Sequence, residues 1–170
     1  MISYRKAAPE DCAALALVKQ KVWQTTYRGI YSDSKIDNYS LTENEQYFFS
    51  LIQTSDISLF VAHRGKEIIG YMCCGKPLHP FREYRQELAL LYVLPEYQGH
   101  GVSKALFSIA RQQFEAVFCR EFFISVNRYN LNALNFYLHL GGLVAEIDED
   151  KPDKSEVQIK LCFKISPQSE

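Results

Sequence analysis

Runs of apolar and alternating residues along the chain predict seven β-strands. The predicted strands cover residues 2–6, 58–63, 67–74, 87–94, 121–126, 143–147 and 156–165. The runs at 87–94 and 121–126 are almost entirely apolar, which is typical of strands that are buried on both faces of a sheet. These two strands are therefore expected in the interior of the sheet.

Helical periodicity predicts about four helices between these strands. They begin at Pro9, Thr42, about Gly99 and Asn130, and Gly29 breaks the first of them. The helix at 99–118 lies between the two apolar strands, so strand, helix and strand form a βαβ unit whose strands should be parallel. Two further pairs of strands are predicted to form hairpins. The expected fold is an α/β (α+β) domain with a mixed, mostly antiparallel sheet.

Length and composition favour one domain that spans residues 1–170. Hydrophobic residues make up 47% of the chain, charged residues 23%, and the formal net charge is −1. The near-neutral balance argues against a nucleic-acid partner, which requires a basic surface. No apolar run approaches the roughly 20 residues of a membrane span, and the first residues contain no apolar stretch of signal-peptide length. A cytoplasmic location with no membrane partner is therefore expected.

Neither a metal site nor a disulfide framework is expected. The chain has five cysteines, among them the adjacent Cys73 and Cys74, and it contains no Cys-x-x-Cys motif. Its four histidines do not have the spacing of metal ligands. The cysteines are expected to be reduced, and no metal is predicted.

The segment from Gln98 to Lys104 predicts a binding site for a phosphate group. An apolar strand ends before it, Gly99 and Gly101 follow, and a helix begins. Amides at the start of a helix have no intrahelical partner, and glycines let a phosphate approach the main chain closely. The Gly-x-Gly-x-x-Gly pattern would need a glycine at Lys104. The Gly-x-x-x-x-Gly-Lys-Ser/Thr pattern would need one at Ser103, so neither nucleotide-binding motif is present.

Two motifs resemble those of the GNAT family, the GCN5-related N-acetyltransferases. The first, Gln/Arg-x-x-Gly-x-Gly/Ala at the start of a long helix, here reads Gln98-Gly-His-Gly-Val-Ser103. The second, Asn-x-x-Ala-x-x-Phe-Tyr-x-x-x-Gly-Phe, reads Asn130-Leu-Asn-Ala-Leu-Asn-Phe-Tyr-Leu-His-Leu-Gly-Gly142, with glycine in place of the final phenylalanine. The order of the predicted elements also suits the family. The resemblance covers nearly the whole chain and implies a GNAT-like seven-stranded sheet.

The resemblance implies that the cofactor is acetyl-CoA and assigns residues to its binding. The main chain of Leu91, Tyr92 and Val93 would pair with the pantetheine arm, which requires this strand to splay from its parallel neighbour. The Leu91 amide would polarise the thioester carbonyl. Asn130 would flank the sulfur end of the cofactor. The pyrophosphate would be held by Gln98, Gly99, His100, Gly101, Val102, Ser103 and Lys104.

Acetylation of an amine requires a base for the ammonium and an acid for the departing thiolate. Glu87 is the candidate base, because it lies eleven residues before Gln98, where some GNAT members carry a catalytic glutamate. The alternative for Glu87 is a carboxylate in solvent at the end of a strand. Tyr137, in the second motif, is the candidate acid. Its alternative is an aromatic core residue beside Phe136.

The acceptor is expected to be held by the first helix region, the loop from Lys76 to Arg85 and the last hairpin. Trp23, Tyr27 and Tyr31 follow one another at four-residue spacing, which predicts either a buried stripe or an aromatic wall over a substrate cleft. Asp33 and Asp37, together with the acidic run at 148–150, are candidates for attracting a cationic amine. A solvated surface is the alternative for the acidic run.

The function predicted from these features is acetyl-CoA-dependent N-acetyl transfer. The acceptor would be a primary amine of a small molecule or peptide, and transfer would be direct, within a ternary complex. Two alternatives stay open: a non-catalytic module that binds acyl-CoA, and a transferase of another acyl group. The edge strands of the C-terminal hairpin also permit a homodimer.

Overall fold

A computed structural model describes residues 1–165 and contains one seven-stranded sheet with the strand order β1-β2-β3-β4-β5-β7-β6. Its strands are β1 (Ile2–Lys6), β2 (Ile57–Arg64), β3 (Glu67–Gly75), β4 (Glu87–Val93), β5 (Glu121–Asn127), β6 (Leu143–Asp148) and β7 (Gln158–Lys164). All neighbouring strands are antiparallel except β4 and β5, which are parallel. The prediction of a mixed, mostly antiparallel sheet with a central parallel pair is therefore confirmed.

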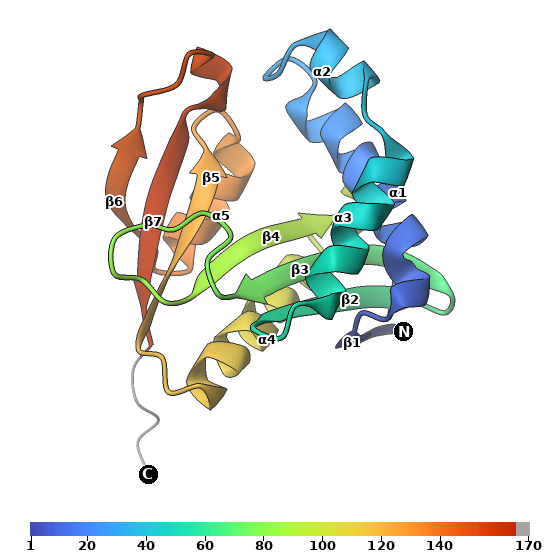
Figure 1. The fold of residues 1–170 in the computed structure, drawn as a ribbon, viewed down its shortest axis with the longest axis horizontal. Helices are drawn as coiled ribbons and strands as arrows, with labels where there is room; N and C mark the ends of the chain where they lie inside the picture. The colour runs from blue at the N-terminus through green and yellow to red at the C-terminus, as the bar shows by residue number, and fades with distance from the viewer. Residues whose placement is uncertain (166–170) are drawn as a thin grey trace.

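The described part of the chain forms five α-helices, and all but α2 pack against the sheet. They are α1 (Cys12–Val22), α2 (Asp33–Asp37), α3 (Leu41–Gln53), α4 (Val102–Ala116) and α5 (Leu131–His139). Figure 1 shows α1 and α3 on one face of β2, β3 and β4, with α4 on the opposite face. Strands β5, β6 and β7 diverge from β4 as a separate wing, and α5 lies against this wing. The core forms where the apolar side of each helix meets the sheet.

The first helix is shorter than the sequence pattern predicts. Regular α-helix ends at Val22, and one π-helical turn, η2 (Trp23–Tyr27), follows before the left-handed Gly29 at φ 84°. The apolar pattern does not change at Val22, so nothing in it could reveal this turn. The short helix α2 was also not predicted. The Ser32 side chain caps it by accepting a hydrogen bond from the Lys35 amide.

Strands β4 and β5 pair in parallel over a very short length. Glu87 and Phe123 are the only register partners between them in the described chain. Past this point β4 stays paired with β3, whereas β5 stays paired with β7. The register of β3 and β4 also shifts at Cys73 and Cys74, a bulge that bends β4 as it leaves β5. The splay that the resemblance requires is present.

In residues 1–165, no helix is both long and apolar enough to cross a membrane. The same part of the chain contains no group of three or more His, Cys, Asp or Glu side chains that could hold a metal ion.

Gly142, which replaces the usual phenylalanine of the second motif, lies in a place without room for a side chain. Its amide donates to the Tyr137 carbonyl oxygen over 3.0 Å, just after the end of α5. A Cβ atom there would lie 2.8 Å from the Phe163 ring and 2.9 Å from the Tyr137 carbonyl oxygen. Phe163 is itself fixed, because it stacks on Phe122 with ring centroids 4.9 Å apart.

We predict that Gly142→Ala lowers the free energy of unfolding by about 1–3 kcal/mol, since a methyl group must displace a packed ring or backbone. Urea denaturation measures the change. Ser108→Ala, at an exposed position of α4, is the control and should stay within about 0.5 kcal/mol of wild type. Equal stability of the two variants would contradict this account of the packing.

Candidate functional site

A cavity of about 290 Å³ opens where β4 and β5 part. Strand β4 contributes one wall, β5 the opposite wall, and the start of α5 lies against its side. The lining includes Leu91, Tyr92, Val93, Gln98, Gly99, Ser103, Ser125, Asn130, Tyr137 and Tyr27. The fold thus brings residues from both sequence motifs and from the aromatic stripe to one place.

One end of the cavity has the geometry of an anion cradle. Gly99 and Gly101 have φ angles of 76° and 81°, and a Cβ atom built on either would meet nothing within 4 Å. The main chain at this turn is therefore open to a ligand. Gly101 is the N-cap of α4, so the first amides of that helix have no partner within it. The Gln98 side chain fixes the turn by donating to the Val93 carbonyl oxygen over 3.0 Å.

The residues assigned to the phosphate site by resemblance fall into two groups. Gln98, Gly99 and Ser103 line the cavity. Of the others, Val102 is buried in the core, while His100 and Lys104 are exposed. The His100 ring is turned back on the loop, with Nδ1 2.8 Å from the Gln98 carbonyl oxygen.

The main chain of β4 offers a second binding feature. Residues 88–93 form the cavity wall, and their hydrogen bonds go to β3, because β4 pairs with β5 only at Glu87. A strand edge without a partner can pair with an extended chain that enters beside it. The cavity therefore fits an extended ligand with a phosphate group at one end.

Tyr137, on α5, also lines this cavity. Its ring is buried among aromatic residues, with centroids 5.2 Å from Phe136 and 6.4 Å from Phe107. Burial raises the pKa of Tyr137 above its ordinary value, so the hydroxyl carries its proton at neutral pH. Asn130 caps α5 by accepting a hydrogen bond from the Ala133 amide over 3.2 Å. This cap holds the helix that presents Tyr137.

Glu87 is buried, with 1% of its surface exposed, so the alternative of a solvent-exposed carboxylate is wrong. Its Oε2 atom accepts hydrogen bonds from the amides of Leu78 and His79 over 2.8 and 3.3 Å. The His79 ring lies 3.9 Å from Oε1, and this contact raises the pKa of His79. Glu87 does not line the cavity in the described chain. It anchors the loop before β4 at the point where β4 and β5 join.

The aromatic residues before α2 form one cluster, of which a single ring reaches the cavity. Tyr27 stacks on Tyr31 with centroids 4.9 Å apart, and Trp23 lies 5.5 Å from Tyr31. Tyr27 lines the cavity, whereas Trp23 and Tyr31 lie behind it. Trp23 also lies 5.6 Å from the Nζ atom of Lys19, a lysine whose pKa burial lowers to about 8. Tyr27 is buried and Trp23 and Tyr31 are partly buried, while an aromatic wall over a substrate cleft stays a prediction that only Tyr27 is placed to meet.

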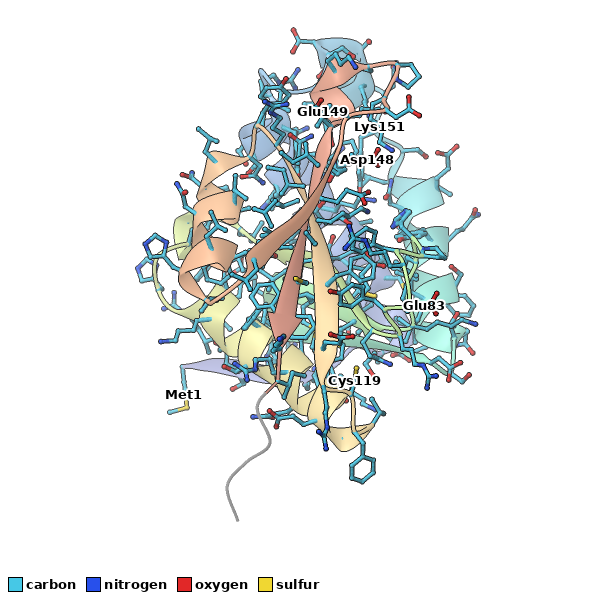
Figure 2. The ribbon with its side chains drawn as sticks, turned by 90° about the vertical axis from the view of Figure 1, so that its left-hand side faces the viewer. Met1, Glu83, Cys119, Asp148, Glu149 and Lys151 are labelled. Carbon is cyan, nitrogen blue, oxygen red and sulfur yellow. The ribbon has the colours of Figure 1, made fainter. Side chains whose placement is uncertain are left out.

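Four of the five acidic residues expected to attract an amine form ion pairs within the protein. Arg28 binds both Asp33 and Asp37, over 2.9 and 2.8 Å. Figure 2 shows Asp148, Glu149 and Lys151 near one another at the end of the C-terminal hairpin. Lys151 lies 2.8 Å from the Asp148 carboxylate. Arg28, Arg128 and Lys151 thus offset part, but not all, of the negative charge of these five carboxylates.

Sequence reasoning missed two polar residues beside the cavity. Ser125 lies in the apolar strand β5 and lines the cavity, and Lys160 on β7 donates to its Oγ atom over 2.7 Å. Each is a polar residue inside a run predicted to be a strand, and this irregularity is the one sequence feature that could have indicated a functional role. Their pairing could not be read from the sequence, because 35 residues separate them.

One cavity thus has an open, glycine-rich turn at the start of α4, an unpaired edge of β4 and a buried tyrosine in its lining. The family model for the acetyltransferase (GNAT) family matches residues 22–141. The chain belongs to this family and is an acetyltransferase.

Individual relatives agree with this assignment. Spermidine N(1)-acetyltransferase of Thermoplasma acidophilum is 26% identical over 152 residues, which cover 86% of this chain and 91% of that protein. The crystal structure of the PaiA N-acetyltransferase of Thermoplasma acidophilum in complex with coenzyme A has a TM-score of 0.80 and 26% identity, covering 97% of this chain and 99% of that one. An acetyltransferase of Salmonella typhimurium with its cofactor acetyl-CoA has a TM-score of 0.74 and 17% identity, covering 99% and 96%.

Proposed function

We propose that this protein transfers the acetyl group of acetyl-CoA to a primary amine of a small molecule or peptide, directly within a ternary complex. The observation that carries the proposal is the single cavity that joins the anion cradle, the free edge of β4 and Tyr137. A module that only bound an acyl-CoA would need the cradle and the edge. It would have no use for a protonated tyrosine in the same cavity.

The proposal assigns a part of the donor to each feature of the cavity. The amides at the start of α4 and the open turn at Gly99 and Gly101 would hold the pyrophosphate. The free edge of Leu91, Tyr92 and Val93 would bind the amide groups of the pantetheine arm. The thioester supplies an activated acetyl group. The Leu91 amide would donate to its carbonyl oxygen, where negative charge develops during transfer.

Tyr137 is proposed as the general acid. The phenol is protonated at neutral pH, as an ordinary tyrosine is, and burial raises its pKa further. Its proton is therefore available to the basic thiolate that departs. The α5 cap at Asn130 and the neighbouring Phe136 ring restrict the helix and the ring that carry the hydroxyl. Such positioning is what proton transfer requires.

Glu87 is proposed as the general base with a water molecule between it and the amine, because its side chain does not line the cavity. The carboxylate is buried at the foot of the cavity wall and is fixed by two loop amides. A water-bridged base of this kind is compatible with general base catalysis.

Spermidine is the first acceptor to test, because a relative that covers most of this chain is a spermidine N(1)-acetyltransferase. The aromatic face of Tyr27 is the one part of the cluster that lines the cavity. An aromatic face attracts a cation and would favour an ammonium group near the acetyl donor. Peptide N-termini are the second class to test.

We expect saturable binding of acetyl-CoA in a calorimetric titration, with neither NAD nor ATP binding comparably. Release of free coenzyme A in the presence of spermidine, other small amines and peptides then tests transfer. Acetyl-CoA binding without turnover on any acceptor would support the binding-module alternative. Absence of acetyl-CoA binding at millimolar concentration would overturn the proposed function.

Tyr137→Phe should lower kcat by roughly 10²-fold while acetyl-CoA affinity changes little, since only the phenolic proton is removed. Steady-state kinetics on the best acceptor and a calorimetric titration provide the two measurements. Tyr129→Phe is the matched control, because Tyr129 is exposed and precedes the cap of α5. If the two variants have the same kcat, Tyr137 is not the acid.

Glu87→Gln should lower kcat/KM by about 10²-fold at neutral pH, because the amide cannot accept the proton of the ammonium. Glutamine still has an oxygen that accepts the loop hydrogen bonds, so the melting temperature should change little. Glu83→Gln, on the exposed part of the same loop, controls for the loss of one charge. A rate for Glu87→Gln equal to that of the control would leave Glu87 with an anchoring role alone.

A further inference from the structure

The middle of β5 carries one polar side chain in an otherwise apolar stretch, and this side chain lines the cavity. Ser125 lies two residues past Phe123, where β5 last pairs with β4. Lys160 is its register partner on β7 and donates from Nζ to Ser125 Oγ over 2.7 Å. A serine oxygen that accepts a hydrogen bond still has its own hydrogen to donate. Among residues 1–165 that hydrogen has no acceptor, so Ser125 can donate it to a ligand in the cavity.

Lys160 is in an unusual position for a lysine. It is half-buried, and its Nζ atom lies 5.7 Å from the ring centroids of both Phe81 and Phe123. Within residues 1–165 it forms no ion pair, and Ser125 is its one side-chain hydrogen-bond partner. Partial burial of an ammonium without a carboxylate costs free energy. The position therefore requires an explanation beyond stability.

The charged groups around Lys160 come from several elements. Those that influence it are Glu87 on β4, Glu146 and Asp148 on β6, Lys151 in the following loop, and His79 in the loop before β4. The carboxylates favour the charged form of the lysine, and the cations oppose it. Burial is the largest influence and lowers the pKa of Lys160 below its ordinary value.

We propose that Ser125 is a further catalytic residue, whose hydroxyl donates a hydrogen bond to the thioester oxygen, and that Lys160 is its positioning residue. This inference rests on the proposed function. During transfer, the neutral amine nitrogen forms a bond to the thioester carbon and loses a proton through water toward Glu87. The carbon–sulfur bond breaks, and the departing thiolate takes up a proton from Tyr137. Ser125 keeps its proton throughout. Its hydrogen bond strengthens as negative charge develops on the oxygen, opposite the Leu91 amide.

Lys160 contributes in two ways. Its hydrogen bond holds the serine oxygen so that the hydroxyl hydrogen points away from β7. Its positive charge polarises that hydroxyl, which makes it a stronger donor. The serine in the cavity wall and the half-buried ammonium behind it are then parts of one arrangement.

The first test does not depend on an acceptor. Infrared difference spectroscopy of bound acetyl-CoA, carrying ¹³C at the thioester carbonyl, reports the hydrogen bonds to that oxygen. Loss of a donor should raise the carbonyl stretching frequency in Ser125→Ala, and Ser125→Thr should restore it. Calorimetry should show that all variants still bind acetyl-CoA. An unchanged band in Ser125→Ala would overturn the proposal even if no acceptor is known.

The second test uses turnover on the best acceptor. Ser125→Ala should lower kcat by about 10²-fold with a small change in KM, the usual effect of removing one donor to a developing oxyanion. Ser125→Thr should recover most of the rate. Lys160→Met should lower kcat in the same direction, whereas Lys164→Met, at an exposed position of the same strand, should not.

The pH profile separates a positioning role of Lys160 from a purely structural one. Because the pKa of Lys160 lies below that of an ordinary lysine, its charge is lost as pH rises, and kcat should fall on the alkaline side. Lys160→Arg keeps its charge to higher pH, so this decline should move upward. An identical alkaline limb in both proteins would leave Lys160 outside the mechanism. If the wild-type protein does not bind acetyl-CoA, the proposed function itself is overturned.

Discussion

The short contact between β4 and β5 is the constraint on which the rest of the structure depends. The two strands are register partners only at Glu87 and Phe123, after which each follows its other neighbour. Fully paired strands would leave no cavity and no free edge. Strands without any contact would leave two sheets with no fixed distance between them. The single pairing both joins the halves of the sheet and opens the site.

The contact between β4 and β5 includes a buried carboxylate, that of Glu87. A buried carboxylate is costly unless it is hydrogen-bonded, and Glu87 meets this condition through the amides of Leu78 and His79. The loop that supplies these amides also packs its Phe81 ring on Phe123, with centroids 5.3 Å apart. Glu87, the residue proposed as the base, therefore also stabilises the point where β4 and β5 part. For this reason its tests measure reaction rate and stability separately.

Further supports fix the walls once the strands have parted. Gln98 ties the anion cradle to the end of β4, and the Asn130 cap fixes the start of α5. Asn127, at the end of β5, donates to the Tyr31 hydroxyl and to the Ser155 carbonyl oxygen, over 3.2 and 2.7 Å. This buried amide connects the aromatic cluster to the C-terminal wing. Each wall of the cavity is thereby held by a polar contact that the sheet alone does not provide.

The sequence by itself determined the strands, the parallel central pair and the anion cradle. The strands follow from local periodicity, and the parallel pair follows from the helix between its two strands. The cradle follows from glycines, which can adopt the left-handed backbone conformation of the turn. Two motifs were also enough to indicate the family. The tertiary structure decided which residues share the cavity. It buried Glu87 under a loop, brought Tyr27 but not Trp23 or Tyr31 to the wall, and paired Asp33 and Asp37 with Arg28. It also placed Lys160 behind Ser125. Such contacts join distant parts of the chain, and the pattern of neighbouring residues does not encode them.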